Sequence, residues 1–307
     1  MDSKLFTPFQ LGPLTLRNRT IRSAAFESMG KDFGPTQKLK DYHVSVARGG
    51  VGMTTLAYAS INRSGVSFNS QLWLREEIIP ALKDITDAIH REGAAAAIQI
   101  GHCGNMTHWS TAGSFPVSAS NGFNLYSPTF HRRMSHAEIA ATAKDFGRAV
   151  RTAHEAGFDS VEVHAGHGYL ISQFLSPWTN RRRDSYGGSL TNRMRFMQEC
   201  LTEVLEEAAK LKMAVVVKHN MEDGFKGGIE VPESIEIARE IERLGVHGLV
   251  LSSGFVSRAP MAVMRGRIPT KTMGYYMGWN EWLQKIVVSL FGQWMIKQYD
   301  FEECFFL

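Results

Sequence analysis

Two histidines and a tyrosine follow a short apolar run near the middle of the chain. The run Val161–Val163 is typical of a buried strand, and His164, His167 and Tyr169 come directly after it. A strand that leads into such residues delivers hydrogen-bond donors to a cleft. Because the histidines are spaced i, i+3 on a turn entering a helix, both rings lie on one face and can point N–H groups at one oxygen atom.

The histidines belong to one of several units in which a short β-rich run precedes a helical pattern. This alternation predicts a parallel sheet, either open or closed into a barrel. No G-x-G-x-x-G follows the first strand, which argues against a dinucleotide-binding open sheet, and polar residues after several successive strands favour a barrel. We therefore predict one α/β domain over residues 1–307, a TIM-type (β/α)8 barrel with a small hairpin at Phe6–Arg17. The expected parallel strands are Thr20–Ala24, Val51–Tyr58, Ala94–Ile100, Ser160–His164, Ala214–His219 and Gly248–Ser252.

The helices between these strands carry start and stop signals. Ser135 opens a capping box of the form Ser-x-x-Glu, and Gly157 is placed to end that helix. Pro232 stands where the first turn of another helix belongs. Apolar residues at helical spacing predict a third helix between Met194 and Ala208, and a further one is expected over residues 276–297.

Composition indicates a soluble globular protein, with 44% hydrophobic and 21% charged residues. The net charge of +4 comes from scattered basic residues. The run Arg181–Arg183 has no aromatic platform, so we expect a solvated or salt-bridged loop and no nucleic-acid partner. Three distant cysteines offer neither a disulfide framework nor a clustered metal site. Without a signal core or a long apolar run, we expect a cytoplasmic protein with no membrane partner.

The stretch from His164 to Phe196 resembles the β4–α4 segment of the Old Yellow Enzyme family, the FMN-dependent NADH:flavin oxidoreductases and ene-reductases. Shorter matches occur in family order at Leu16–Arg19, Arg48–Gly52, Ile98–Gly104 and Val216–Lys218, so the resemblance runs nearly end to end. It implies a barrel with FMN over its carboxyl-terminal mouth. The flavin would take hydride from NAD(P)H at N5 and pass it to an activated alkene or another electron-poor acceptor.

The resemblance also implies catalytic roles for the three residues introduced first. His164 and His167 would bind the carbonyl oxygen of a small-molecule substrate and stabilise the enolate that develops there. Tyr169 would donate a proton to the α-carbon, because a phenol with a pKa near 10 stays protonated at neutral pH.

Flavin contacts are implied for the ends of the first two strands. Ala24, Ala25 and Phe26 match largely backbone contacts of the first strand. Many relatives carry threonine or cysteine at the position of Phe26, which cannot donate a hydrogen bond to tune the flavin potential. Tyr58 matches a contact at the end of the second strand.

Gln99 and Lys218 complete the expected cofactor site. Gln99 has both a donor and an acceptor, which suits the pyrimidine edge of a flavin. The charge of Lys218 would stabilise the reduced flavin near N1 and the C2 carbonyl. A lysine inside a barrel strand needs a partner, and a ligand would explain it.

The chain departs from the family after the sixth strand. Relatives close the barrel with two further units whose loops grip the FMN phosphate. Here Ser252–Gly254 is followed by a Met- and Trp-rich stretch, and no phosphate-binding loop is recognisable before Leu307. We therefore expect an incomplete barrel of about six units without strands 7 and 8, weakened FMN binding, and open edges that favour a homo-oligomer.

Two other functions remain open. An incomplete barrel could be a non-catalytic remnant that binds, regulates or oligomerises through its edges. Alternatively, His164 and His167 could hold zinc in a metal-dependent barrel hydrolase, with Glu162 or His102 as a third ligand. Because Glu162 alternates with two valines, we expect it to face away from the histidines, and we predict no metal ligands.

Overall fold

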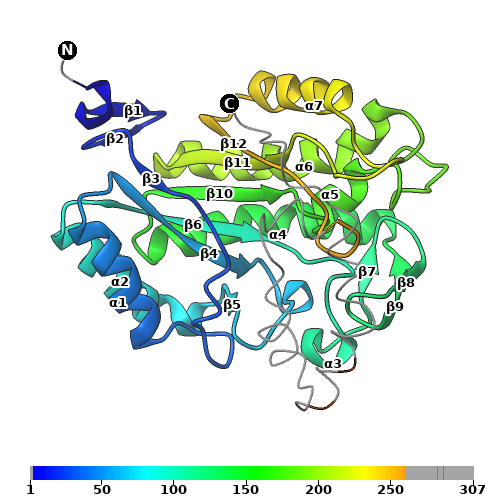
Figure 1. The fold of residues 1–307 in the computed structure, drawn as a ribbon, viewed down its shortest axis with the longest axis horizontal. Coiled ribbons are helices and arrows are strands. Elements are labelled where there is room, and N and C mark those ends of the chain that lie inside the picture. Colours follow the sequence, from blue (N-terminus) through cyan, green and yellow to red (C-terminus); the bar gives the residue numbers. More distant parts are fainter. Residues whose placement is uncertain (1–2, 260–281, 283–285, 287–307) are drawn as a thin grey trace.

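The computed structural model describes residues 3–259 together with residues 282 and 286. Six parallel strands lie side by side in chain order, and the short β5 (Leu72–Trp73) pairs with one of them. The sheet curls into part of a barrel (Figure 1), which confirms the predicted fold class. The six are β3 (Ile21–Arg22), β4 (Met53–Ser60), β6 (Ala95–Gly101), β10 (Ser160–Ala165), β11 (Ala214–Asn220) and β12 (Gly248–Ser252).

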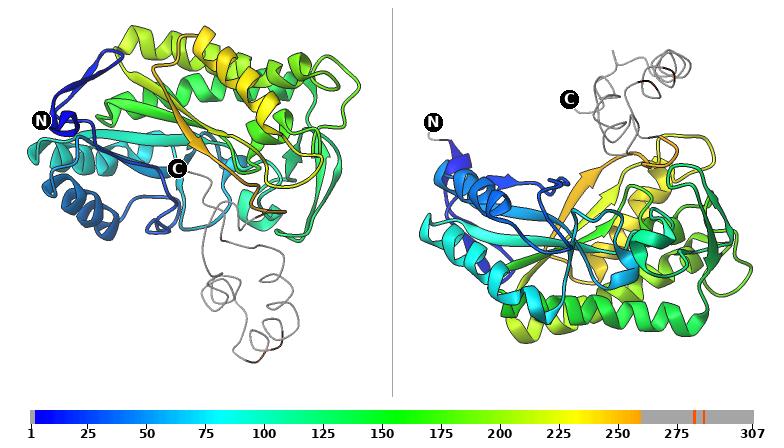
Figure 2. Two further views of the ribbon diagram at one scale, coloured as in Figure 1. Left: turned by 45° about the horizontal axis from the view of Figure 1, so that its top comes forward. Right: turned by 90° about the horizontal axis from the view of Figure 1, so that it is seen from below.

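Helices cover the outer face of this sheet, as the two views of Figure 2 show. The long ones are α1 (Gln37–Arg48), α2 (Ile79–Arg91), α4 (His136–Glu155), α6 (Leu190–Leu211) and α7 (Val231–Arg243). Two shorter helices follow strands, α3 (Trp109–Ala112) and α5 (Leu170–Leu175). The capping box at Ser135 and the proline in the first turn of α7 are both confirmed. The helix expected over residues 276–297 lies outside the described stretch 3–259.

Side chains along each strand alternate between the helix-facing and the barrel-facing side of the sheet, so the protein has two separate interiors. Side chains such as Ile98, Val163 and Val217 face the helices and belong to the main apolar core. The residues between them face the inside of the barrel, because successive side chains of a strand point to opposite faces. At the amino-terminal end this inner space is filled by a small apolar cluster that includes Leu11 and Leu16. These two residues come from the predicted hairpin, strands β1 (Phe9–Leu11) and β2 (Leu14–Leu16).

A small cap that the sequence did not predict lies at the opposite, carboxyl end of the sheet (Figure 1). It consists of β7 (Val117–Ser118), β8 (Gly122–Asn124) and β9 (Thr129–Arg133). Arg182 holds it in place, because its guanidinium donates to the carbonyl oxygens of Ala119 and Met134 at 3.1 and 2.8 Å. The same group is paired with Asp184 at 2.7 Å and is buried, so the middle arginine of the basic run has a structural role.

The capping box gives a first prediction. Ser135→Ala removes the hydroxyl that accepts a hydrogen bond from the Glu138 amide, and we expect the free energy of unfolding to fall by about 1 kcal/mol. Urea unfolding followed by circular dichroism measures it. Thr152→Ala is the matched control, since its hydroxyl only bonds the carbonyl of Arg148 within the same helix and its loss is close to neutral. Equal effects of the two variants would contradict the capping role.

Candidate active site

A cavity of about 600 Å³ opens inside the barrel at the carboxyl ends of the strands. Every residue expected in the site from the sequence lines this one cavity, although they come from five different strand ends. Further residues in its wall were not predicted. The expected residues are Ala24, Ala25, Phe26, Tyr58, Gln99, His164, His167, Tyr169 and Lys218, and the additional ones include Ser23, Phe68, Tyr126, Val250, Ser252 and Val256.

His164 presents an unsatisfied ring to this cavity. The residue is 4% exposed, and its Nδ1 is buried without a hydrogen-bond partner in the described part of the chain. Its ring centroid lies 5.0 Å from that of His167 and 4.7 Å from that of Tyr169. Burial lowers the pKa of His164 well below 6.5, and the charges of His167 and Lys218 lower it further. The imidazole is therefore neutral at neutral pH, and an unpaired buried nitrogen indicates a place for a ligand atom.

His167 is held beside it by a left-handed turn. Its φ is 59°, and its backbone N–H donates to Asn220 Oδ1 at 3.1 Å. The ring Nε2 lies 2.6 Å from Ser252 Oγ, so the hydroxyl can donate to Nε2 and leave the ring proton on Nδ1. Burial, and secondarily the charge of Lys218, lowers the pKa of His167 to about 3. Asn220 and Ser252 are positioning residues that the sequence did not reveal, although Ser252 ends a predicted strand.

Tyr169 remains protonated at any ordinary pH. Burial, followed by the proximity of Tyr126 and Cys103, raises its pKa above 10. The residue immediately precedes α5, where its backbone caps the helix and its ring lies next to His164. Tyr58 contributes its ring to the wall, because its hydroxyl donates to the carbonyl oxygen of Gly65.

A buried ion pair forms the floor of the cavity. Lys218 Nζ lies 3.2 Å from Glu162 Oε1 and donates to the carbonyl oxygen of Ala24 at 2.6 Å. Gln99 Nε2 donates to the same carboxylate oxygen at 2.6 Å. The expectation that Glu162 faces away from His164 was wrong, since residues two apart on a strand share a face. Lys218 therefore has a partner within the chain, and its burial does not by itself require a ligand.

The end of β3 forms an apolar rim. Ala24 is buried, whereas Ala25 and Phe26 are exposed to the cavity. Phe26 is 44% exposed and stacks on Phe68 with ring centroids 5.5 Å apart. The position that could have tuned a flavin by a hydrogen bond thus supplies an aromatic surface instead.

A metal centre finds no support within the described residues 3–259, where no group of three acidic, histidine or cysteine side chains could hold an ion. Glu162 is bonded to Lys218 and Gln99, and His102 Nδ1 accepts from the amide of Gly104. The third ligand that a barrel hydrolase would need is therefore occupied elsewhere. No helix in the described part of the chain is long and apolar enough to cross a membrane.

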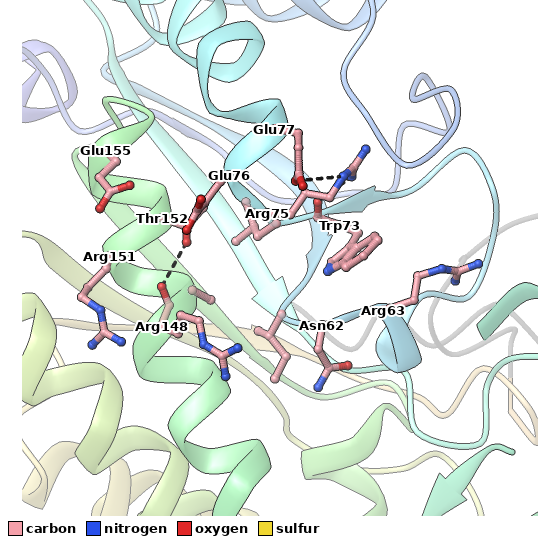
Figure 3. Close-up of a pocket in the computed structure, with 13 residues that line it drawn as sticks. Asn62, Arg63, Trp73, Arg75, Glu76, Glu77, Arg148, Arg151, Thr152 and Glu155 are labelled. Atoms are coloured by element: carbon pink, nitrogen blue, oxygen red, sulfur yellow. Dashed lines mark hydrogen bonds and ion pairs between the residues drawn. The ribbon is translucent and has the colours of Figure 1, made fainter. Parts of the chain in front are cut away.

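A second hollow of about 420 Å³ lies outside the barrel, between α4 and the segments that follow β4 and β5 (Figure 3). It collects four arginines and three glutamates, and no residue expected in the site lines it. Arg75 lies 3.6 Å from Glu77, and Arg151 lies 3.0 Å from Glu207. Arg148 is paired with Asp145. Three of the four arginines that line this hollow are therefore paired with carboxylates.

The cavity inside the barrel fits a flavin in its chemistry. Lys218 and Gln99 place a cation and an amide on its floor, Phe26 adds an aromatic surface at the rim, and His164 keeps an unpartnered nitrogen. These residues would hold the polar edge and one face of a planar, electron-accepting ring. A barrel sheet with this set of side chains at its carboxyl end defines a flavin-dependent oxidoreductase.

Comparison with known proteins agrees with this class. The family model of the NADH:flavin oxidoreductase / NADH oxidase family matches residues 4–274. The chain therefore belongs to this family, in which FMN is the cofactor and NADH or NADPH the electron donor. A 4,4'-dithiodibutanoate disulfide reductase of Rhodococcus erythropolis is 35% identical over 304 residues, which are 99% of this chain and 74% of that protein.

Solved structures show the same fold. A 2-naphthoyl-CoA reductase in complex with 2-naphthoyl-CoA has a TM-score of 0.79 at 28% identity; the match covers 88% of this chain but only 43% of the larger protein. An Old Yellow Enzyme homologue from Zymomonas mobilis has a TM-score of 0.76 at 22% identity, over 95% of this chain and 86% of its own. The family resemblance inferred from His164–Phe196 is thus confirmed.

The buried ion pair gives a second prediction. Glu162→Gln leaves Lys218 buried without a counter-charge, and we expect the free energy of unfolding to fall by about 3–5 kcal/mol. The double variant Glu162→Gln/Lys218→Met removes both charges and should recover most of this loss, as measured by urea unfolding. A double variant less stable than Glu162→Gln would show that the two groups are not coupled.

The buried histidines give a third prediction. The pKa of each histidine is lower in the folded than in the unfolded chain. The contribution of the two neutral rings to the stability of the fold is therefore complete above pH 6.5 and is lost as the pH falls, because the unfolded chain takes up protons first. We expect unfolding free energy to decline between pH 6.5 and 5 by up to about 1.4 kcal/mol per pH unit for His164. The contribution of His167, which is partly exposed to the cavity, is smaller. His102 and His219, each with a pKa lowered to about 4 by burial, act in the same direction.

Urea unfolding at several pH values compares the native chain with His164→Asn/His167→Asn. This variant should show a shallower decline over the same range, because two of the buried imidazoles are gone. An unchanged slope would mean that both rings bind a proton as readily in the folded as in the unfolded chain, which would contradict the lowered pKa values.

Proposed function

We propose that this protein is an FMN-dependent NAD(P)H oxidoreductase that reduces an activated alkene bearing a carbonyl group. The observation that carries the proposal is the convergence of His164, His167 and Tyr169 on the cavity that also contains Lys218 and Gln99. When bound, FMN accepts hydride from NAD(P)H and returns it to the acceptor. The protein's own side chains bind the acceptor, orient it and supply its proton.

The histidines polarise the carbonyl of the acceptor. Both are neutral, so each ring offers one N–H donor and one acceptor nitrogen. With Ser252 donating to Nε2 of His167, Nδ1 of that ring donates to the carbonyl oxygen. The unpartnered imidazole of His164 supplies a second donor. Two fixed donors stabilise the negative charge that develops on this oxygen when the β-carbon receives hydride.

Tyr169 supplies the proton that completes the reduction. Its raised pKa keeps the phenol protonated until a carbanion forms beside it, and its ring lies against His164, where the carbonyl group would bind. The hydride goes to the β-carbon and the phenolic proton to the α-carbon, so the double bond is saturated. Solvent then reprotonates the phenolate.

A disulfide is a second candidate acceptor. The relative that is similar over 99% of this chain is a reductase of 4,4'-dithiodibutanoate, a disulfide. Hydride attack on one sulfur would break the S–S bond, and the leaving thiolate would take a proton from Tyr169, giving two thiols. Parallel assays with 2-cyclohexenone and with 4,4'-dithiodibutanoate distinguish the two acceptors by kcat/KM.

Titration with FMN tests the proposed function directly. We expect the purified chain to take up FMN and its flavin absorbance to bleach on addition of NADPH, then to recover on addition of the acceptor. A chain that binds no FMN would instead favour the non-catalytic remnant that pairs through its sheet edges.

Tyr169→Phe gives a fourth prediction. Because the proton is needed only when the acceptor is reduced, acceptor-dependent reoxidation of the flavin should slow by about 10²–10⁴-fold, far more than its reduction by NADPH. Stopped-flow absorbance measures the two half-reactions separately. Tyr126→Phe is the matched control, since it removes a phenol from the same cavity wall. Equal slowing by both variants would contradict the assignment of Tyr169 as proton donor.

We also propose that the protein is a cytoplasmic homo-oligomer. Strand β12 lies at one end of the described sheet, and its Leu249 and Leu251 are 38% and 54% exposed. An exposed apolar strand edge is a surface on which a second chain can pair. Light scattering coupled to size-exclusion chromatography gives the mass, and a monomer at micromolar concentration would contradict this.

A further inference from the structure

A smaller chamber of about 310 Å³ adjoins the active-site cavity. Two chain segments form walls of both spaces. Leu125 and Ser257 line the chamber. Their chain neighbours Tyr126 and Val256 line the active-site cavity. The two spaces therefore lie on either side of these two segments.

Within the described residues, the wall of the chamber carries a positive charge without an acidic side chain beside it. Arg181 and Arg258 line it, and none of the described residues in its wall is acidic. Both side chains are exposed, and neither is within salt-bridge distance of a carboxylate in residues 3–259. Within the described residues, the guanidinium of Arg181 donates through Nε to the carbonyl oxygen of Trp178 at 3.3 Å, and its backbone N–H donates to Ser120 Oγ at 2.8 Å. This contrasts with the hollow of Figure 3, whose wall includes three glutamates and where Arg75 pairs with Glu77.

Arg258 is pre-organised by aromatic rings. Its guanidinium lies over the rings of Trp178 and Phe225, 4.9 and 5.1 Å from their centroids. Those rings pack edge to face with each other and with Phe255 at centroid distances of 5.4–5.8 Å. Contact with two rings holds the guanidinium in place. An arginine held in this way can bind a carboxylate or phosphate through two N–H groups.

Several polar groups in the rest of the wall bond to one another or to the backbone. Asn124 Nδ2 donates to the carbonyl oxygen of Asn105 at 2.8 Å, and Asn105 Nδ2 lies 3.2 Å from His131 Nε2. Nδ1 of His131 donates to the carbonyl oxygen of Ser120 at 3.0 Å. Among the residues that the structure describes, the two arginines therefore determine the charge of the chamber wall.

From these contacts we infer that the chamber formed by Trp178, Arg181 and Arg258 binds the anionic end, phosphate or carboxylate, of a reactant whose other end occupies the active-site cavity. Two reactants could carry this anion. One is the diphosphate of NAD(P)H, and the other is an acidic acceptor such as a dicarboxylate. The identity of the reactant rests on the proposed function, whereas binding of the anion itself does not.

Anion binding is tested without flavin chemistry by titrating the 307-residue chain with inorganic pyrophosphate in a calorimeter. We expect Arg181→Gln and Arg258→Gln each to weaken the affinity about tenfold or more, since a charge-assisted hydrogen bond is lost. Arg183→Gln is the matched control, because Arg183 is exposed in the same loop and does not line the chamber. Unchanged affinity in the double variant Arg181→Gln/Arg258→Gln overturns the inference, and circular dichroism confirms that the variants fold.

Kinetics of the FMN-loaded protein then identify the reactant. A raised KM for NADPH in Arg258→Gln, with the KM for 4,4'-dithiodibutanoate unaltered, assigns the chamber to the donor. The opposite pattern assigns it to acidic acceptors, and 2-cyclohexenone, which has no charge, should keep its KM in either case. If neither the donor nor the acidic acceptor changes its KM, the chamber does not serve a reactant and the inference is wrong. An inactive protein that still binds pyrophosphate would refute the proposed function alone.

Discussion

The site depends on one buried charge and its compensation. Lys218 is 5% exposed inside the barrel, and such a cation is tolerated there only because Glu162 and the carbonyl oxygen of Ala24 surround it. Pairing of this ammonium group therefore joins the end of β3 to strands β10 and β11. It also fixes Gln99, which shares the carboxylate of Glu162. The hydrogen-bonding floor of the cavity is thus set by the need to keep one ammonium group paired.

The fold could largely be predicted from the sequence because its signals are local. Short β-rich runs marked five of the six parallel strands, and the capping box at Ser135 marked the start of α4. The remaining strand, expected at Thr20–Ala24, has no such run and is only Ile21–Arg22 in the structure. The cap β7–β9 was not predicted, because its short strands lack an apolar run and are held by a distant guanidinium, that of Arg182. Interactions between remote segments leave no periodic pattern in the chain.

The residues that line the candidate site could be predicted from strand ends and family motifs. The residues that hold them in place could not. Each expected residue lines the same cavity, since the carboxyl ends of parallel strands meet. Ser252, which orients His167, was not predicted. Glu162, which pairs with Lys218, was predicted on the wrong face of its strand. For Glu162 the signal was present: it is two residues before His164 on one strand, and that spacing places both inside the barrel.

The hydrogen bond from Lys218 to Ala24 spans 194 positions of the chain. During synthesis, the helix-facing contacts of β4, β6 and β10 can form while the floor of the cavity is still incomplete, since the lysine emerges from the ribosome much later. Closing so long a loop is entropically costly and slow. A ligand that recognises the completed floor binds only chains in which the segments of Ala24 and Lys218 have met, and its binding therefore stabilises this long-range contact.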